Sequence, residues 1–87
     1  MAMNYVVHWT DAALAELAAV WLAAADRNAV TAASHQLEQE VAADPHGRGI
    51  PRRGGPGYMA VEPPLCIEYE VIEGDKTVRV LHVWSLV

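Results

Sequence analysis

The sequence is poor in cysteine and in positive charge, and each shortage excludes a class of protein. A single cysteine, Cys66, stands among its 87 residues, so an internal disulfide is impossible and a reducing compartment, the cytoplasm, is expected. Six lysines and arginines face eleven acids, which gives a net charge of −5. That balance argues against broad electrostatic attachment to nucleic acid, although it does not exclude a local basic site.

Long apolar runs and targeting signals are also missing. No stretch of about 18 apolar residues occurs, so no membrane-spanning helix is expected. The first residues, MAMNYVVHWTDAAL, lack a basic segment followed by an apolar one, so we expect no secretory signal peptide. Because the four histidines are scattered, no metal-ligand spacing stands out, and we expect neither metal nor cofactor. With 53% hydrophobic and 20% charged residues, the chain is predicted to be one globular domain over residues 1–87.

The first half of the sequence predicts one strand and two helices. The β-branched and aromatic stretch Asn4–Trp9 is typical of a strand, and Thr10 can cap the alanine-rich helix that follows. Either Asp26 or Asn28 can cap a second helix, which Asp44–Pro45 ends because the residue before a proline avoids helical geometry. The short connection predicts an antiparallel helical hairpin. Apolar residues recur at helical spacing, at Leu14, Leu17, Trp21 and Ala25 and then at Val30, Ala33 or Ser34, Leu37 and Val41.

The second half predicts a three-stranded meander. Turn sequences separate three stretches rich in β-branched and aromatic residues, which are Tyr58–Glu62, Leu65–Ile72 and Thr77–Trp84. We therefore predict an α+β fold in the order strand, helix, helix, three-strand meander, with the helical hairpin covering one face of an antiparallel sheet. Because successive side chains of a strand point to opposite faces, the face of the sheet away from the helices is expected to be partly polar, with Glu68, Glu70 and His82.

Positive charge is concentrated in one irregular segment, DPHGRGIPRRGGPGY (44–58). It holds three of the six lysines and arginines, five of the six glycines and three of the five prolines, and no acid follows its first residue until Glu62. This composition predicts a loop between the helical hairpin and the meander. Two interpretations of the charge stay open: a solvated loop that is polar for general reasons, or a phosphate site built from Arg48, Arg52 and Arg53.

In the order and spacing of its parts, the chain resembles the RelE/ParE superfamily of type II toxins. The parts are YVVHWTDAALAELAAVWLAAADR, a second helix ending in ADP, and the hairpin PLCIEYEVIEGDKTVRVLHVW. The resemblance implies the toxin of a toxin–antitoxin pair, neutralised by an antitoxin whose C-terminal segment wraps it in a hetero-oligomer. RelE-like members are endoribonucleases that cleave mRNA at the ribosome in a bacterial-type stress response, whereas ParE-like members inhibit DNA gyrase by protein contact. A degenerate member that binds its antitoxin without toxicity is the third alternative.

Two features depart from the usual pattern of the ribonucleases. Such members carry an arginine shortly before the tyrosine of the third strand, and here Cys66 takes that place ahead of Tyr69. They are generally basic and end the last strand in a polar, basic cluster, whereas this chain is acidic and ends in VWSLV. If the chain cleaves RNA, other arginines must stabilise the charge of the reaction.

RNA cleavage needs a base for the 2′-hydroxyl, a cation for the phosphorane and an acid for the leaving oxygen. Arg52 and Arg53 are the predicted catalytic cations, because a guanidinium matches phosphate oxygens, and together with Arg48 they are the predicted nucleic-acid-binding residues. His82, near the end of the last strand, is the predicted catalytic histidine, although a histidine in an apolar strand is more often structural. Arg79 shares a face with His82 only if a bulge interrupts the strand.

Several other residues have simpler expected roles. Tyr69, Trp9 and Trp21 are predicted to lie in the core. Glu68 and Glu70 would repel phosphate if the polar face of the sheet were the binding groove, which is a physical argument against RNA binding across the middle of the sheet.

Overall fold

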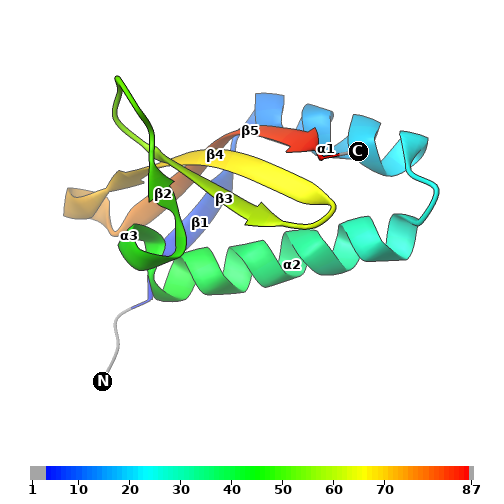
Figure 1. Ribbon diagram of the computed structural model, residues 1–87. Coiled ribbons are helices and arrows are strands. Elements are labelled where there is room, and N and C mark those ends of the chain that lie inside the picture. Colours follow the sequence, from blue (N-terminus) through cyan, green and yellow to red (C-terminus); the bar gives the residue numbers. More distant parts are fainter. Residues whose placement is uncertain (1–3, 87) are drawn as a thin grey trace.

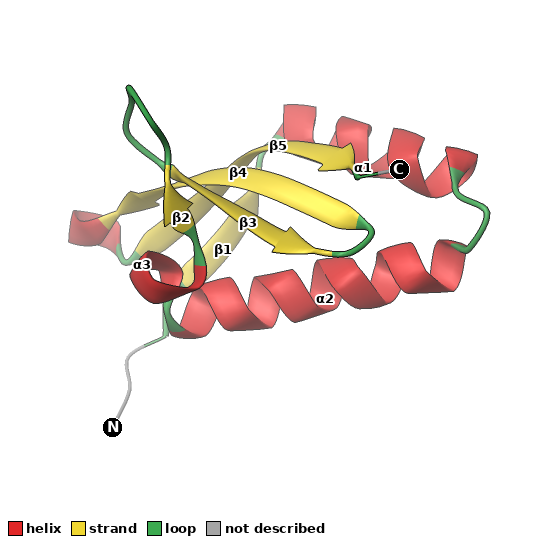
Figure 2. Cartoon of the chain, viewed as in Figure 1, coloured by secondary structure: helices red, strands yellow, loops and turns green. Residues whose placement is uncertain are grey.

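The computed structural model describes residues 4–86 and shows a five-stranded sheet packed with helices (Figures 1 and 2). The elements in chain order are β1 (Val6–Trp9), α1 (Asp11–Ala23), α2 (Arg27–Ala43), α3 (Pro45–Arg48), β2 (Ile50–Pro51), β3 (Tyr58–Glu62), β4 (Leu65–Ile72), the 3₁₀ turn η1 (Glu73–Asp75) and β5 (Thr77–Ser85). The strand order in the sheet is β1-β5-β4-β3-β2. The predicted α+β class and the order of the main elements are confirmed. Among the described residues, no helix is both long and apolar enough to cross a membrane.

β1 is the strand whose pairing differs from the expectation. It runs parallel to β5, whereas every other neighbouring pair in the sheet is antiparallel. The sheet is therefore mixed rather than wholly antiparallel, because alternation along a strand says nothing about the direction of its partner. Parallel pairing needs a long crossover connection, and the chain between β1 and β5 contains both long helices.

α1 lies along the edge of β5 and is joined to it by hydrogen bonds. Thr10 Oγ1 caps the helix by accepting an early backbone N–H at 3.2 Å, and it donates to the carbonyl of Val80 at 2.8 Å. β1 pairs with only the first four residues of β5. Farther along, Glu16 on α1 accepts the backbone N–H of Val83 at 3.0 Å. The helix thus covers the part of the β5 edge that β1 leaves unpaired.

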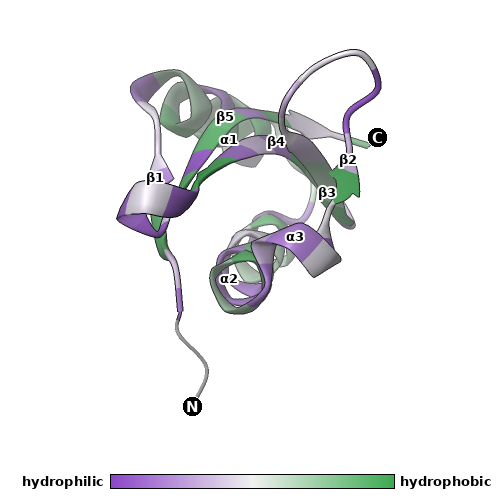
Figure 3. Ribbon diagram, turned by 90° about the vertical axis from the view of Figure 1, so that its left-hand side faces the viewer, coloured by the Kyte–Doolittle hydropathy of each residue, from purple (hydrophilic) through white to green (hydrophobic). Residues whose placement is uncertain are grey.

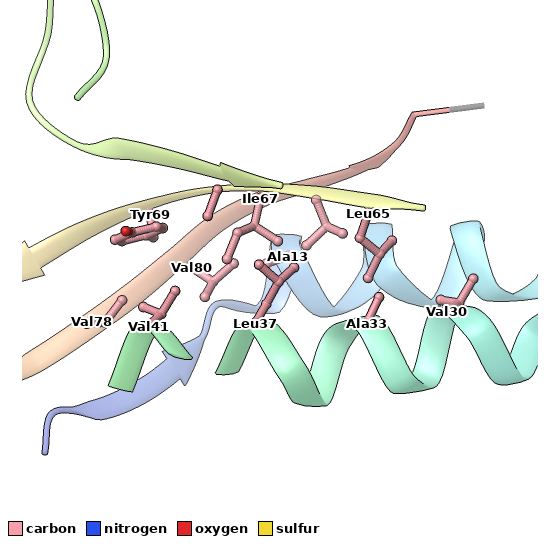
Figure 4. Packing of buried hydrophobic residues seen from close by; sticks show 12 residues of the cluster. Ala13, Val30, Ala33, Leu37, Val41, Leu65, Ile67, Tyr69, Val78 and Val80 are labelled. Carbon is pink, nitrogen blue, oxygen red and sulfur yellow. The ribbon is translucent and has the colours of Figure 1, made fainter. Parts of the chain in front are cut away.

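α2 lies on the concave side of the curved sheet and closes the core (Figure 3). Asp26 caps it by accepting the backbone N–H of Ala29 at 3.0 Å. Leu37 and Val41 then point at the sheet, where Tyr69 is fully buried, as predicted (Figure 4). The core consists of Ala13, Val30, Ala33, Leu37, Val41, Ala60, Leu65, Ile67, Tyr69, Val78, Val80 and Val83.

Trp21 does not lie in the core, contrary to the prediction, and is 39% exposed. The only residue that α1 buries completely is Ala13, because this helix lies beside β5 rather than under the sheet. The indole ring of Trp21 packs 4.7 Å from the guanidinium of Arg27, and its N–H donates to Thr31 Oγ1 at 3.2 Å. Trp9 is partly buried against the core.

The glycine-rich segment is more ordered than the predicted loop. Asp44 accepts the backbone N–H of Gly47 at 3.0 Å and caps α3, and β2 then pairs with β3. Residues 52–57 form the remaining turn, which extends from the sheet away from α2 (Figure 2). Gly57 has a φ of +109°, and a Cβ at this position would lie 2.9 Å from the carbonyl oxygen of Tyr69. This turn therefore requires glycine at its end.

Candidate functional site

The candidate site lies on the outer face of the sheet, which is the face opposite α2 and carries the charged side chains of Glu68, Glu70, Arg79 and His82. A bulge in β5 brings the last two together. Glu68 is opposite His82 and Tyr69 is opposite Val80, so Leu81 is an extra residue in β5. This is the interruption that the sequence analysis required before Arg79 and His82 could share a face.

Each carboxylate of β4 on the outer face is paired with an arginine. Arg52 Nη1 lies 2.6 Å from Glu68 Oε2, and Arg79 Nη1 lies 2.9 Å from Glu70 Oε1. The side chain of Glu68 is only 16% exposed. The two arginines offset the negative charge that was expected to repel phosphate, so that argument against the outer face loses much of its weight.

His82 lies between two carboxylates from different elements. Glu68 is its cross-strand partner on β4, and residues in such pairs have Cβ atoms about 5 Å apart. Its Nδ1 lies 3.3 Å from Glu16 Oε1 on α1, and about half of the side chain is exposed. The structure thus gathers Arg52, Glu68 and His82 from the turn after β2 and from strands β4 and β5.

Glu68 is the residue that the sequence analysis did not assign to catalysis. The alternation in β4 put it on the polar face, but an alternating glutamate is usually a solvated one. The signal that singles it out is its contact with Arg52 together with its register against His82, and both depend on the bulge and on the path of the glycine-rich segment.

The other two arginines of the segment have different surroundings. Arg53 is exposed on the turn, and within residues 4–86 no carboxylate pairs with it. Arg48 donates to Glu40 Oε1 and to the carbonyl of Val61, both at 2.6 Å, and lies 3.4 Å from Glu62 Oε1. Its hydrogen bond is the main cause that lowers the pKa of Glu40. Arg48 would have to release these partners to contact nucleic acid, and its binding role stays a prediction.

Cys66, which stands where the ribonuclease pattern has arginine, is buried. Its register partners are Val61 on β3 and Trp84 on β5. Burial raises the pKa of the thiol. A buried, neutral thiol has no charge to offer a phosphate, so the outer face depends on Arg52 and Arg79 for positive charge.

A second polar cluster ties the N-terminal segment, α3 and η1 together at one end of the sheet. His46 contacts the Tyr58 hydroxyl through Nδ1 at 2.7 Å and the carboxylate of Glu73 through Nε2. Tyr5 donates to the same carboxylate at 2.7 Å, and Lys76 pairs with it at 3.1 Å. These contacts, the one from His46 first, lower the pKa of Glu73 to about 2.

This cluster predicts an acid-sensitive contribution to stability. Because the pKa of Glu73 in the folded chain is about 2 against an ordinary value of 4.5, its contribution is present above about pH 4.5 and is lost as the pH falls toward 2. Urea unfolding of the wild type and of Glu73→Gln should therefore show a difference in unfolding free energy that shrinks between about pH 5 and pH 3. A difference that is constant over this range would contradict the assignment.

The described part of the chain contains no group of three or more histidine, cysteine, aspartate or glutamate side chains that could hold a metal ion. What the outer face offers is two carboxylates, each beside a guanidinium group, and an imidazole, which come from β4, β5 and the turn that follows β2. Such a set can accept a proton, stabilise negative charge and donate a proton.

Comparison with known proteins gives similarity in structure only. No protein-family model and no curated protein matches the chain. A chain of the RelBE2 toxin–antitoxin complex of Mycobacterium tuberculosis superposes with a TM-score of 0.80 at 20% identity, covering 95% of this chain and 92% of that one. A mutant of the E. coli toxin RelE in the free state gives 0.69 at 20% identity, covering 95% and 84%.

The same fold also occurs in a larger protein. TrmO from P. aeruginosa superposes with a TM-score of 0.61 at 22% identity, covering 94% of this chain but 34% of its own. At these identities the likenesses establish the fold, and the resemblance to RelE drawn from the sequence is confirmed at that level.

Proposed function

We propose that this protein is the toxin component of a type II toxin–antitoxin pair and that it cleaves mRNA at the ribosome. The observation that carries the proposal is the grouping of Arg52, Glu68 and His82 on the outer face, where each supplies one of the three functions that RNA cleavage needs. The RelE-like fold supports the toxin class. An antitoxin is the expected partner, and a cytoplasmic location, expected from the single cysteine, is part of the proposal.

The proposed reaction is an attack of the ribose 2′-oxygen on the adjacent phosphate. Glu68 accepts the proton of the 2′-hydroxyl, and the oxygen then forms a bond to phosphorus while the bond to the 5′-oxygen breaks. Protonated His82 donates its proton to that leaving oxygen, so the products are a 2′,3′-cyclic phosphate and a free 5′-hydroxyl. Arg52 turns from Glu68 toward the phosphate as charge develops, and the exposed Arg53 holds a neighbouring phosphate.

A second candidate is a protein that acts by contact alone, either as an inhibitor of DNA gyrase or as a non-toxic antitoxin-binding member. The observation that favours it is the burial of Cys66 at the place of the usual arginine. An active ribonuclease must then rely on an arginine of the turn at residues 52–57, and this turn is not part of any strand of the sheet.

Induction of the protein in growing bacteria, followed by sequencing of mRNA 5′ ends, tests the proposal. We expect growth arrest with new mRNA ends that carry 5′-hydroxyl groups, and relief of both by Arg52→Ala combined with Arg53→Ala. Arrest without new ends would count against cleavage, and filamentation with DNA-damage signalling would favour gyrase. No effect at good expression would favour the non-toxic member.

The antitoxin can be tested separately. A small open reading frame beside the gene, with a DNA-binding start and an acidic or amphipathic tail, is expected to encode it. Its product should co-purify with this chain as a hetero-oligomer and restore growth when it is co-expressed. The absence of such a reading frame would weaken all three alternatives, which are the ribonuclease toxin, the gyrase inhibitor and the non-toxic antitoxin-binding member.

A further inference from the structure

A second row of polar side chains crosses the outer face beside the candidate site. Arg79 on β5 is the register partner of Glu70 on β4 and of His8 on β1. Register partners on neighbouring strands point to the same face, so these three side chains form one row across three strands, which we call the Arg79 row. The row ends at β1, the edge strand of the sheet, and the reaction proposed above does not use it.

The Arg79 row has hydrogen-bond donors to spare. Arg79 Nη1 lies 2.9 Å from Glu70 Oε1, and the arginine side chain is 45% exposed. A guanidinium has five N–H donors in a fork that matches phosphate oxygens, so this one contact leaves others for a ligand. His8 is exposed, and within residues 4–86 no hydrogen bond or ion pair holds its side chain. Because even a neutral imidazole has one N–H donor, Arg79 and His8 can bind one anion together.

The two sides of Arg79 differ in how well they suit an anion. The side toward β4 is occupied by the carboxylate of Glu70, which pairs with Arg79. The side toward β1 carries the imidazole of His8 instead. Neighbouring strands are about 4.8 Å apart, so a phosphate between Arg79 and His8 can contact both while it stays away from the carboxylate. The anion site that this geometry offers therefore lies between β5 and β1.

The Arg79 row lies one step along the strands from the side chains of the proposed reaction. Glu68 and Glu70 are two residues apart on β4, which separates their rows by about 7 Å. The bulge at Leu81 keeps His82 on the same face as Arg79. Neighbouring phosphates of an extended nucleic-acid chain have a similar spacing. An RNA with its scissile phosphate at Glu68 and His82 can therefore place the next phosphate at the Arg79 row.

The proposed reaction also gives the RNA a direction across the sheet. Glu68 on β4 takes the proton of the 2′-hydroxyl, and His82 on β5 protonates the leaving 5′-oxygen. The ribose that is attacked from within thus lies over β4, and the departing nucleotide lies over β5. Since β1 is the next strand beyond β5, the chain on the 3′ side of the cut continues toward β1.

We propose that Arg79 and His8 bind the phosphate on the 3′ side of the departing nucleotide and so position the message for cleavage. The RNA runs from the turn at residues 52–57 across β4 and β5 and leaves the sheet at β1. This inference rests on the proposed function, because its direction comes from the roles of Glu68 and His82.

Binding of a labelled 2′-O-methyl oligouridine, which cannot be cleaved because it lacks the 2′-hydroxyl, tests the subsite without cleavage. We expect binding about tenfold weaker in Arg79→Ala and about threefold weaker in His8→Ala, as for the loss of a charged and of a neutral hydrogen bond. A lost phosphate contact also releases fewer counterions. The slope of log K against log salt should therefore become shallower by about 0.7 in Arg79→Ala.

Arg27→Gln and His35→Gln are the matched controls, because they change the same types of side chain on α2, away from the outer face. All four side chains are exposed, so the four variants should keep the melting temperature of the wild type. The two control variants should bind the oligouridine as the wild type does, with the same salt slope.

A neutral linkage locates the contact along the message. The cut in a ribosome-bound message is mapped first, and the phosphate on the 3′ side of the departing nucleotide is then replaced with a methylphosphonate. This change should slow cleavage by the wild type by about tenfold but have little further effect in Arg79→Ala, because both changes remove the same contact. A methylphosphonate on the 5′ side of the attacked ribose should slow both proteins equally.

The two measurements separate a failure of this inference from a failure of the proposed function. Normal binding by Arg79→Ala, additive effects of Arg79→Ala and the 3′ methylphosphonate, or coupling of Arg79 to the 5′ linkage would each overturn the subsite while cleavage stands. If the wild type binds oligouridine through Arg79 but cuts no message, the phosphate site stands, and the ribonuclease proposal and the direction of the RNA fall. A wild type that neither binds nor cuts would overturn both proposals.

Discussion

Replacing Arg52 with alanine is expected to lower the rate of mRNA cleavage by about 100-fold or more, which is the usual cost of removing one preorganised donor to a developing negative charge. Arg52 is the arginine of the glycine-rich segment that contacts Glu68 on the outer face, opposite His82. Cleavage of a ribosome-bound message by purified protein, followed with time, measures the effect. Arg52→Lys should recover only part of the rate, because lysine keeps the charge but lacks the guanidinium fork.

The control for this prediction is Lys76→Ala, which removes one positive charge in the second polar cluster, where Lys76 pairs with Glu73 and lies over the ring of Tyr5 rather than on the outer face. Its cleavage rate should stay near that of the wild type. Equal losses in both variants would mean that only net charge matters, and an unchanged rate in Arg52→Ala would remove this residue from the mechanism.

Leu37→Ala is expected to lower the free energy of unfolding by about 2–5 kcal/mol, the range for truncating a buried leucine. Leu37 is fully buried at the centre of α2, and it is the main apolar side chain that this helix directs at the middle of the sheet (Figure 4). For a chain of 87 residues a loss of this size is a large share of the total stability. Urea unfolding followed by circular dichroism measures it.

Leu22→Ala is the matched substitution on α1, where the side chain is 63% exposed. It should change the unfolding free energy by no more than about 0.5 kcal/mol. If the two variants lost similar amounts, α1 would contribute as much packing as α2, contrary to the burial of these residues.

The sequence determined much of the fold through local rules. Thr10 and Asp26 have the side chains that cap helices, and both cap one here. Alternation in β4 assigned Tyr69 to the core and Glu68 to the opposite face, because successive side chains of a strand point to opposite sides. The concentration of arginine in the glycine-rich segment was also visible, since composition needs no coordinates.

Tertiary structure decided what these residues do together. The extra residue Leu81 turns His82 onto the face of Arg79, and a bulge of this kind depends on how two strands pair rather than on either strand alone. The partners of Arg48 and Arg52 come from α2, β3 and β4, so their different roles follow from the path of the chain. Likewise, Trp21 has the spacing of a core residue but is exposed, because α1 packs against the edge of β5. The sequence therefore specified elements and faces, while contacts between distant segments set the site.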